Sequence, residues 1–162
     1  MQQFYKALAI LYVSFFTAGA VSAQENAYDV KHIPPKLLQN ADAVVRDYEK
    51  TVDIQSPGEV KTFLHYAITI LNKNGSHYAQ FSLDYDKFQS IKSISGRIYD
   101  KTGNLVMRIK KQDIEDRAYS NNVDFMDDDR YKEYDCNFAG YPFTCEFDAE
   151  YTTRQTLFLP SL

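Results

Sequence analysis

The side chains best suited to catalytic chemistry are two cysteines, Cys136 and Cys145. A thiolate can attack a substrate, but only where a histidine or another activating group meets it in space. No signature of a thiol enzyme surrounds either cysteine. The three histidines have simpler explanations, because His32 lies in a polar lead-in, His65 within a predicted strand at a surface position, and His77 after a turn. The sequence therefore predicts no catalytic residue and favours a chain that is not an enzyme.

The spacing of the two cysteines favours a disulfide between them. A two-residue loop at Gly140-Tyr141 would make a hairpin from Tyr134 to Tyr151, with Cys136 directly opposite Cys145. Opposed residues have Cβ atoms about 4.5–5.5 Å apart, and a disulfide needs about 3.5–4.5 Å, so a close pair is required. We expect this disulfide if the protein meets an oxidising compartment. The alternative is two small buried thiols among the aromatic residues of the same strand face.

Carboxylates gather in an acidic stretch from Asp124 to Asp135. Calcium binds clustered carboxylates, but the spacing of an EF-hand loop and its turn glycine are missing here. Arg130 and Lys132 can neutralise part of the charge. We expect a solvated loop, and the sequence predicts neither a metal site nor a cofactor.

The N-terminus has the layout of a secretory signal peptide. Lys6 precedes an apolar run over residues 7–16, and small residues follow up to Ala23. The run is shorter than the roughly 20 residues of a membrane span, although an uncleaved anchor is the alternative. We expect cleavage between Ala23 and Gln24. The mature protein would then be exported, periplasmic or extracellular at the cell envelope, with no membrane span left.

Composition limits the partners and favours β-structure. The formal net charge of −4 argues against binding to nucleic acid or to anionic lipid, which both need basic surfaces. The chain has 13 Tyr, 11 Phe and no Trp, and tyrosine and phenylalanine suit half-buried strands. A tyrosine-rich binding face is a second explanation for the same composition.

Alternating apolar residues and turn signals predict a series of short strands. One helical turn is expected after Pro34-Pro35, where proline fits the first turn of a helix. The turns at Asn72-Gly75 and Asp100-Asn104 each carry a glycine that can take a positive φ, and the second has the sequence of a type I turn closed by a glycine bulge. The predicted strands cover residues 43–54, 60–71, 78–85, 91–99 and 105–109.

These strands predict an all-β fold, either an antiparallel β-sandwich or a curled sheet built from hairpins. We expect hairpins to join residues 60–71 to 78–85 and 91–99 to 105–109, with Tyr134–Tyr151 as the last. The polar segment from Lys110 to Asp116 is expected to leave the sheet.

Several segments, in their order along the chain, resemble the domain of unknown function 3857 family. They are Asn40-Ala-Asp-Ala-Val-Val-Arg46, Ile70-Leu-Asn-Lys-Asn-Gly75, Tyr99-Asp-Lys-Thr-Gly-Asn104, Lys111-Gln-Asp-Ile114 and Phe158-Leu-Pro160. The resemblance covers roughly residues 37–160. It implies a β-rich N-terminal module of exported bacterial proteins, which commonly precedes a transglutaminase-like core.

The resemblance implies a division of the chain and a function. We expect a signal peptide over residues 1–23, a flexible lead-in over 24–36, one β domain over 37–160 and a truncated link at 161–162 to a missing domain. The apolar end of the chain, Leu157 to Leu162, reads as an interrupted strand or linker, so we expect a fragment. The catalytic residues of a core are not carried over.

The leading hypothesis is a non-catalytic accessory domain that packs against or positions a transglutaminase-like core in cis and helps to bind its protein or glycan substrate. An independent glycan- or peptide-binding module is the alternative. A small thiol enzyme is the third hypothesis. An exposed tyrosine patch would favour the second, and a reduced cysteine within reach of a histidine would favour the third.

Overall fold

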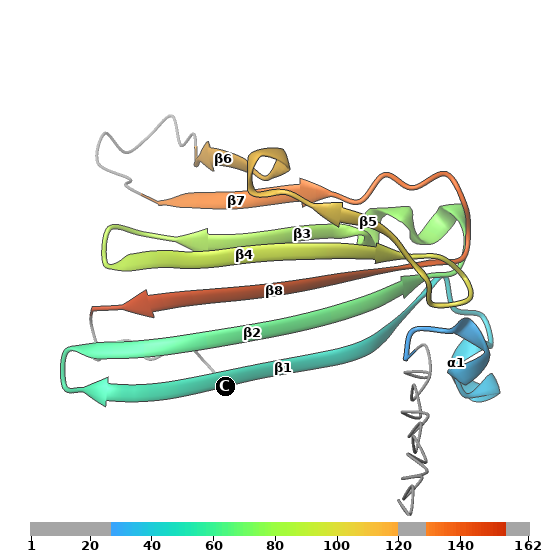
Figure 1. Ribbon diagram of the computed structural model, residues 1–162, viewed down its shortest axis with the longest axis horizontal. Helices are drawn as coiled ribbons and strands as arrows, with labels where there is room; N and C mark the ends of the chain where they lie inside the picture. The colour runs from blue at the N-terminus through green and yellow to red at the C-terminus, as the bar shows by residue number, and fades with distance from the viewer. Residues whose placement is uncertain (1–26, 120–128, 155–162) are drawn as a thin grey trace, which may run out of the picture.

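The computed structural model describes residues 27–119 and 129–154 of the chain (Figure 1). The predicted signal peptide with its cleavage point at Ala23 and Gln24, residues 124–128 of the acidic stretch and the apolar end of the chain lie outside these residues. The rest of the acidic stretch differs from the predicted solvated loop, because Arg130–Asp135 form a strand. No helix in the described part is long and apolar enough to cross a membrane. The elements are η1 (Val30–His32), α1 (Pro35–Leu38), β1 (Ala43–Ser56), β2 (Glu59–Ile70), η2 (Lys73–Tyr78), β3 (Gln80–Tyr85), β4 (Gln89–Tyr99), β5 (Leu105–Ile109), η3 (Lys111–Asp113), β6 (Glu115–Ala118), β7 (Arg130–Asp135) and β8 (Phe143–Thr153).

The strands form two antiparallel sheets, which confirms the predicted all-β fold. The larger sheet has the order β1-β2-β8-β4-β5, and the smaller has the order β3-β7-β6. Figure 1 shows β8, the last strand of the described chain, running between β2 and β4. The short helical turn predicted after Pro34-Pro35 is present as α1.

The core lies where β3 of the smaller sheet packs against β8 of the larger sheet. Phe81 stacks on Phe147 with ring centroids 4.6 Å apart. Alternate residues of β8 point into this core, and Phe143, Cys145 and Phe147 are at most 2% exposed. Burying a large apolar side chain stabilises a fold by about 1.5–3 kcal/mol, so β8 anchors the domain. Its other residues, including Glu146 and Asp148, consequently point to the opposite face of the larger sheet.

Two local hairpins form, of which the sequence predicted the second. β1 pairs with β2, and β4 pairs with β5. The turn of the second hairpin has Gly103 at a φ of 78°, where the backbone N–H of Gly103 donates to the carbonyl of Asp100. The prediction of a glycine bulge is confirmed there, because glycine takes this conformation without strain.

Two predicted hairpins are wrong. Residues 60–71 do not pair with 78–85, because β2 lies between β1 and β8, while η2 carries the chain to the smaller sheet, where β3 pairs with β7. The hairpin from Tyr134 to Tyr151 does not form either, since β7 and β8 belong to different sheets. In both cases a long-range partner replaces the neighbour along the chain.

Gly75 has a different role from the one predicted. Among the described glycines only Gly103 has a positive φ, so Gly75 is not a left-handed turn residue. A Cβ atom on Gly75 would lie 2.2 Å from the carbonyl oxygen of Asp42. Glycine is therefore required for the close approach of η2 to the segment that leads into β1.

The polar segment after β5 leaves the larger sheet, as predicted. η3 turns the chain, and β6 then joins the smaller sheet beside β7. This crossover brings Lys111 and Ile114 close to the first half of β4.

Candidate functional site

The two cysteines are buried and their thiols are free. Cys136 follows β7, where its N–H donates to the carbonyl of Ala79 over 2.8 Å, and Cys145 points into the core from β8. The thiols meet at the core, between the sheets, and not across the hairpin that the sequence suggested. The hydrogen bond with Cys136, together with burial, raises the pKa of the Cys145 thiol far above its ordinary value. A disulfide between these neighbours stays a prediction.

Two of the histidines lie on the surface, away from any reactive partner. His32 is exposed in η1. His77 hydrogen-bonds through Nδ1 to the carbonyl of Asn74 over 2.8 Å, and its ring lies 3.8 Å from that of Tyr78. Within the described residues no histidine hydrogen-bonds to either thiol. The arrangement that a thiol enzyme needs is therefore not formed by these residues.

His65 belongs instead to a charged network on the outer face of the larger sheet. At its centre is Glu146, which is 7% exposed and accepts hydrogen bonds from Tyr28 over 3.0 Å and Tyr99 over 2.6 Å. Arg97 Nε lies 2.6 Å from Glu146 Oε2. Asp148 pairs with His65 Nδ1 over 2.7 Å and with a terminal nitrogen of Arg97. We call Tyr28, His65, Arg97, Tyr99, Glu146 and Asp148 the outer-face network.

The register of the larger sheet places these side chains. His65 on β2 lies directly opposite Asp148 on β8, and Arg97 on β4 lies directly opposite Glu146. Opposed residues on one face have Cβ atoms about 4.5–5.5 Å apart, close enough for direct pairing. The sequence contains one signal of this network, the alternation of acids with apolar residues along β8. It does not show that β2 and β4 are the neighbours of β8.

The segment before η1 supplies Tyr28 from outside the sheet. Arg46 donates to the carbonyls of Ala27 over 2.9 Å and of Tyr28 and Asp29 over 3.4 Å each. The ring of Tyr28 packs against that of Tyr99 with centroids 4.8 Å apart. The lead-in is thus held against the sheet from residue 27 onward, at one end of the outer-face network.

The network keeps its tyrosines protonated and its arginine charged. Burial, followed by the hydrogen bond and charge of Glu146, raises the pKa of Tyr99 to about 12. Burial and then the charge of Glu146 raise the pKa of Tyr28 as well. Burial alone would lower the pKa of Arg97, but the charges of Glu146, Tyr99 and Asp148 outweigh it and raise the pKa.

Three members of the network have the atoms of a metal site. Ligand atoms of His65, Glu146 and Asp148 lie within 4.8 Å of one another, and imidazole with carboxylates suits zinc. However, Arg97 already pairs with both carboxylates, so a dication would have to displace a guanidinium. The donor set fits a metal poorly while Arg97 is in place.

The same residues contain two of the three members of a catalytic triad. His65 hydrogen-bonded to Asp148 has the geometry of an oriented general base. Its other nitrogen, Nε2, lies 3.4 Å from the Tyr28 hydroxyl and 3.8 Å from the Asp47 carboxylate. No serine, threonine or cysteine of the described chain hydrogen-bonds to His65. The network is suited to holding the lead-in on the sheet, with each charge neutralised by a neighbour.

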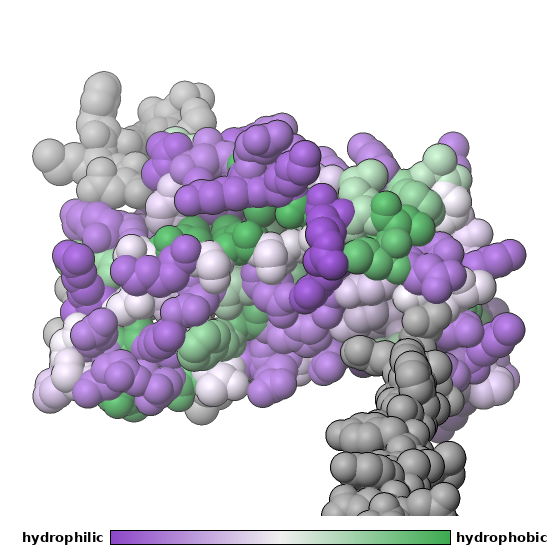
Figure 2. Space-filling model, viewed as in Figure 1, coloured by the Kyte–Doolittle hydropathy of each residue, from purple (hydrophilic) through white to green (hydrophobic). Residues whose placement is uncertain are grey.

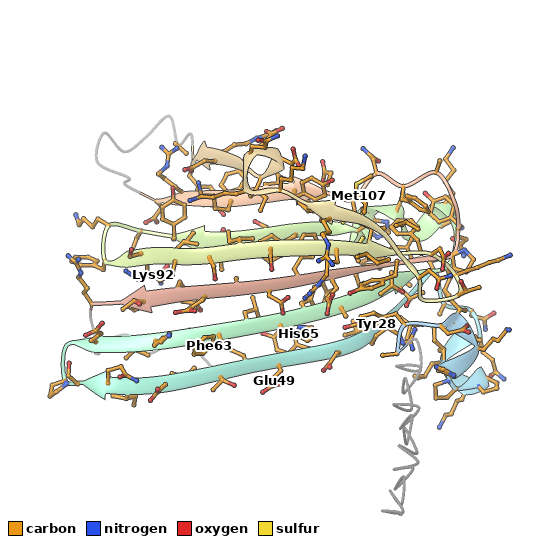
Figure 3. All side chains as sticks on the ribbon, viewed as in Figure 1. Tyr28, Glu49, Phe63, His65, Lys92 and Met107 are labelled. Carbon is orange, nitrogen blue, oxygen red and sulfur yellow. The ribbon has the colours of Figure 1, made fainter. Side chains whose placement is uncertain are left out.

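A shallow groove runs beside the network on the same face. Its volume is about 240 Å³, and Phe63, which is 40% exposed, lies in it. Lys61 Nζ lies 2.7 Å from Glu150 and 4.6 Å from the centre of the Phe63 ring. Figure 3 shows Glu49, Phe63 and His65 on the neighbouring strands β1 and β2, and Figure 2 shows a largely hydrophilic surface around them. We call this the Phe63 groove; Glu49, Thr51, Phe63, His65, Ser93, Asp148 and Glu150 line it.

Comparisons with known proteins agree with this fold. The family described as a domain of unknown function with solved structure, DUF3857, matches residues 56–161. A crystal structure from Parabacteroides distasonis, described as that of a "putative protease", is similar with a TM-score of 0.62 and 15% identity. The similarity covers 72% of this chain and 24% of that chain, so this chain spans about a quarter of the longer protein. No curated protein matches the chain.

Proposed function

The chain belongs to the DUF3857 family, and from this premise we propose that it is a non-catalytic, exported accessory domain. In this proposal the domain packs against a transglutaminase-like core, positions it and contributes to substrate binding. The crystal structure from Parabacteroides distasonis supports the first step, because there the same fold makes up 24% of a longer chain. A fold that occurs inside a larger protein has neighbours to pack against.

The observation that carries the proposal is an apolar edge on β5. Leu105, Val106 and Met107 are 41%, 44% and 43% exposed, and they are consecutive, so the strand presents both of its faces. β5 is the last strand of the larger sheet and pairs only with β4. Figure 2 shows apolar residues gathered there, and Figure 3 places Met107 in the same region.

An apolar edge strand of this kind is normally covered by another part of the protein. Exposed edges offer unpaired N–H and C=O groups, and natural proteins protect them with charges, bulges or covering segments. Leu105, Val106 and Met107 carry no charge, and Arg108 is the one charged side chain of β5. A neighbouring domain that buries them would explain the strand, and a core in the same polypeptide supplies such a neighbour.

Binding to a separately produced core tests the proposal. We expect the exported chain to bind a transglutaminase-like core of an exported bacterial protein in titration calorimetry, and Met107→Lys to weaken binding by about tenfold or more, since about 1.4 kcal/mol is tenfold. Phe63→Ser is the matched control, because Phe63 is equally exposed but lies on the outer face. A core that does not bind, or binds Met107→Lys as well as the native chain, contradicts the proposal.

The non-catalytic part has its own test. We expect no transamidation and no peptide hydrolysis by the chain alone, because Cys136 and Cys145 are buried and contact each other, so that neither presents a thiolate to a substrate, whether as thiols or as a disulfide. Turnover that disappears in Cys136→Ser or Cys145→Ser would replace the accessory role by that of a thiol enzyme.

The Phe63 groove favours a second candidate, an independent glycan- or peptide-binding module. An exposed aromatic ring among carboxylates resembles the mixture of apolar and polar groups in ligand sites. In that case Phe63→Ser abolishes binding of oligosaccharides or peptides measured by calorimetry, whereas Met107→Lys leaves it unchanged. Met107→Lys is therefore the test variant for the accessory domain and the control for the binding module, and Phe63→Ser has the opposite roles.

A further inference from the structure

A larger cavity lies on the other side of β4, at the edge of the sheet. Its volume is about 340 Å³, within the range of roughly 300–1,000 Å³ that ligand sites occupy. Tyr85, Lys111, Ile114 and Lys132 line it together with six consecutive residues of β4, from Gln89 to Ile94. Side chains of a strand alternate between its faces, so a cavity lined by six residues in a row opens onto the strand's edge. We call it the β4-edge cavity.

The backbone along this edge has no partner strand. β5 pairs with β4 only from Gly96 to Tyr99, whereas β8 pairs with β4 along its whole length. In an antiparallel pair every second residue directs its N–H and C=O away from the partner. From Ser90 to Ser95 these outward groups have no backbone partner among the described residues.

The charges around the cavity are positive and only partly neutralised. Lys92 and Lys111 are exposed, and neither forms an ion pair within residues 27–119 and 129–154. Lys132 differs, because it pairs with Asp116. The acids near Lys111 are already engaged, since Asp113 accepts from the N–H of Lys110 and Asp116 also binds Arg130. A cationic site on a chain of net charge −4 indicates a ligand of opposite sign.

The cavity also has an apolar wall. Ile114 is buried, and Ile91 and Ile94 are half-buried and pack against the core. Isoleucines below a pair of unpaired lysines form an amphipathic surface. Figure 3 shows Lys92 on β4, well separated from Met107 of the apolar edge of β5.

We propose that an extended, acidic peptide segment binds along the free edge of β4. Its backbone forms a strand beside Ser90–Ser95, its carboxylates pair with Lys92 and Lys111, and its apolar side chains contact Ile91 and Ile94. This is recognition by strand addition, in which main-chain hydrogen bonds give affinity and side-chain pockets give specificity. The proposal goes beyond the accessory role and does not depend on a core domain.

One observation favours a peptide over a small anion, and another favours an acidic peptide over peptides of other charge. A row of unpaired backbone groups is satisfied by another backbone, whereas a small anion would bind the lysines alone. Lysines on an edge strand ordinarily prevent pairing with other chains, but for an acidic strand they are attractive. A shift in register between Ile91 and Ser93 limits the added strand to a short one.

Fluorescence anisotropy with defined peptides tests the proposal on the full chain. The probe is a labelled octapeptide that alternates valine and glutamate. We expect saturable binding that weakens as salt is added, and the Lys92→Glu, Lys111→Glu double variant to lose about tenfold or more in affinity. The matched control is Lys36→Glu, Lys101→Glu, which changes the net charge equally at two exposed lysines that do not line the cavity. Unchanged affinity in the cavity variant, or an equal loss in the control, contradicts the site.

Further probes separate a strand from a simple anion. A peptide with N-methyl groups on the amides of one edge cannot complete the ladder, and we expect it to bind at least about tenfold more weakly. Octanoate, an apolar carboxylate without a backbone, should not displace the labelled peptide. Equal binding of the methylated peptide, or displacement by octanoate, overturns strand addition in favour of a small-anion site. Self-association in sedimentation that the double variant abolishes overturns it in favour of a second copy of this chain.

Discussion

The outer-face network and the β4-edge cavity both bring charged side chains to the five-stranded sheet, but the charges are paired in the network and partly unpaired in the cavity. In the network, Glu146 and Asp148 each contact Arg97, and the remaining donors come from two tyrosines and a histidine. In the cavity, Lys92 and Lys111 have no acidic partner in the described chain. Charges that are satisfied internally hold the structure together, whereas unpaired charges beside a free strand edge are available to a ligand.

Burial explains why the difference is possible. Glu146 is almost fully buried on the central strand, and a buried carboxylate without partners would be strongly destabilising. Lys92 and Lys111 are exposed, so water solvates them at little cost. Removing a charge should therefore reduce stability at the first place and binding at the second.

The largest effect should come from Glu146→Ala. It leaves the hydroxyls of Tyr28 and Tyr99 without their acceptor and leaves Arg97 with Asp148 as its remaining acid. We expect a loss of roughly 2–4 kcal/mol in the free energy of unfolding, somewhat less than a fully buried pair would give because Arg97 is partly exposed. Glu146→Gln keeps an acceptor and should lose less. Urea denaturation measures both. If neither variant changes stability by more than about 0.5 kcal/mol, the range of ordinary surface substitutions, the network has no structural role.

The next largest effect on stability should come from the two cysteines at the core face of β8. Cys145 adjoins Glu146 in the chain but contacts Cys136 on the opposite side of the sheet. In protein taken from the cell envelope we expect peptide maps with and without reductant to differ by one Cys136–Cys145 link, and reduction to cost about 2 kcal/mol, the low end for disulfides because the loop is short. Two freely alkylated thiols in native material would refute the link.

Asp116 connects the two kinds of charge, because it pairs with Lys132, the third lysine that lines the β4-edge cavity. Burial would raise the pKa of Asp116, but hydrogen bonds from Lys132, Tyr85 and Arg130 outweigh it and lower the pKa from 3.8 to about 2. A depressed pKa means that these bonds stabilise the fold above pH 3.8 and that this contribution is lost as the pH falls through about 2. Asp116→Asn should therefore be less stable than the native chain at neutral pH, with the difference vanishing in acid. A constant difference across this pH range would show that the carboxylate charge is irrelevant.

The same variant should have a smaller, opposite effect on binding. Without Asp116, Lys132 joins Lys92 and Lys111 as an unpaired charge, and we expect the acidic peptide to bind roughly twofold to fivefold more tightly, the value of a surface ion pair. Anisotropy titrations of Asp116→Asn measure this gain. Weaker binding than in the native chain would contradict the assignment of these lysines to the ligand.

Local structure was predictable from the sequence, and long-range pairing was not. The β4–β5 hairpin follows from the turn Asp100–Asn104, whose residues interact with each other. The pairing of β2 with β8 joins residues as distant as His65 and Asp148, 83 positions apart, and no turn signal specifies it. Without that pairing, β2 was expected to pair with β3, and β7 with β8.

The sites depend on the same long-range information. The sequence predicts a surface position for His65, because its partners on β8 and in the lead-in are distant along the chain. The two cysteines were expected to be neighbours through a hairpin, yet they meet because Cys136 and β8 pack at one core. The β4-edge cavity exists because β5 ends its pairing at Gly96, which depends on the crossover through η3 and cannot be read from composition.

Amide hydrogen exchange along β4 tests most directly whether its edge is a free, ligand-binding strand. In the unliganded chain we predict that the outward amides between Ser90 and Ser95 exchange quickly, while those of β8, bonded on both sides, remain protected. Addition of the alternating valine–glutamate peptide should protect the outward amides of β4 and leave those of β8 unchanged. Protection of the β4 edge before any peptide is added, or its continued rapid exchange at saturating peptide, would contradict the account.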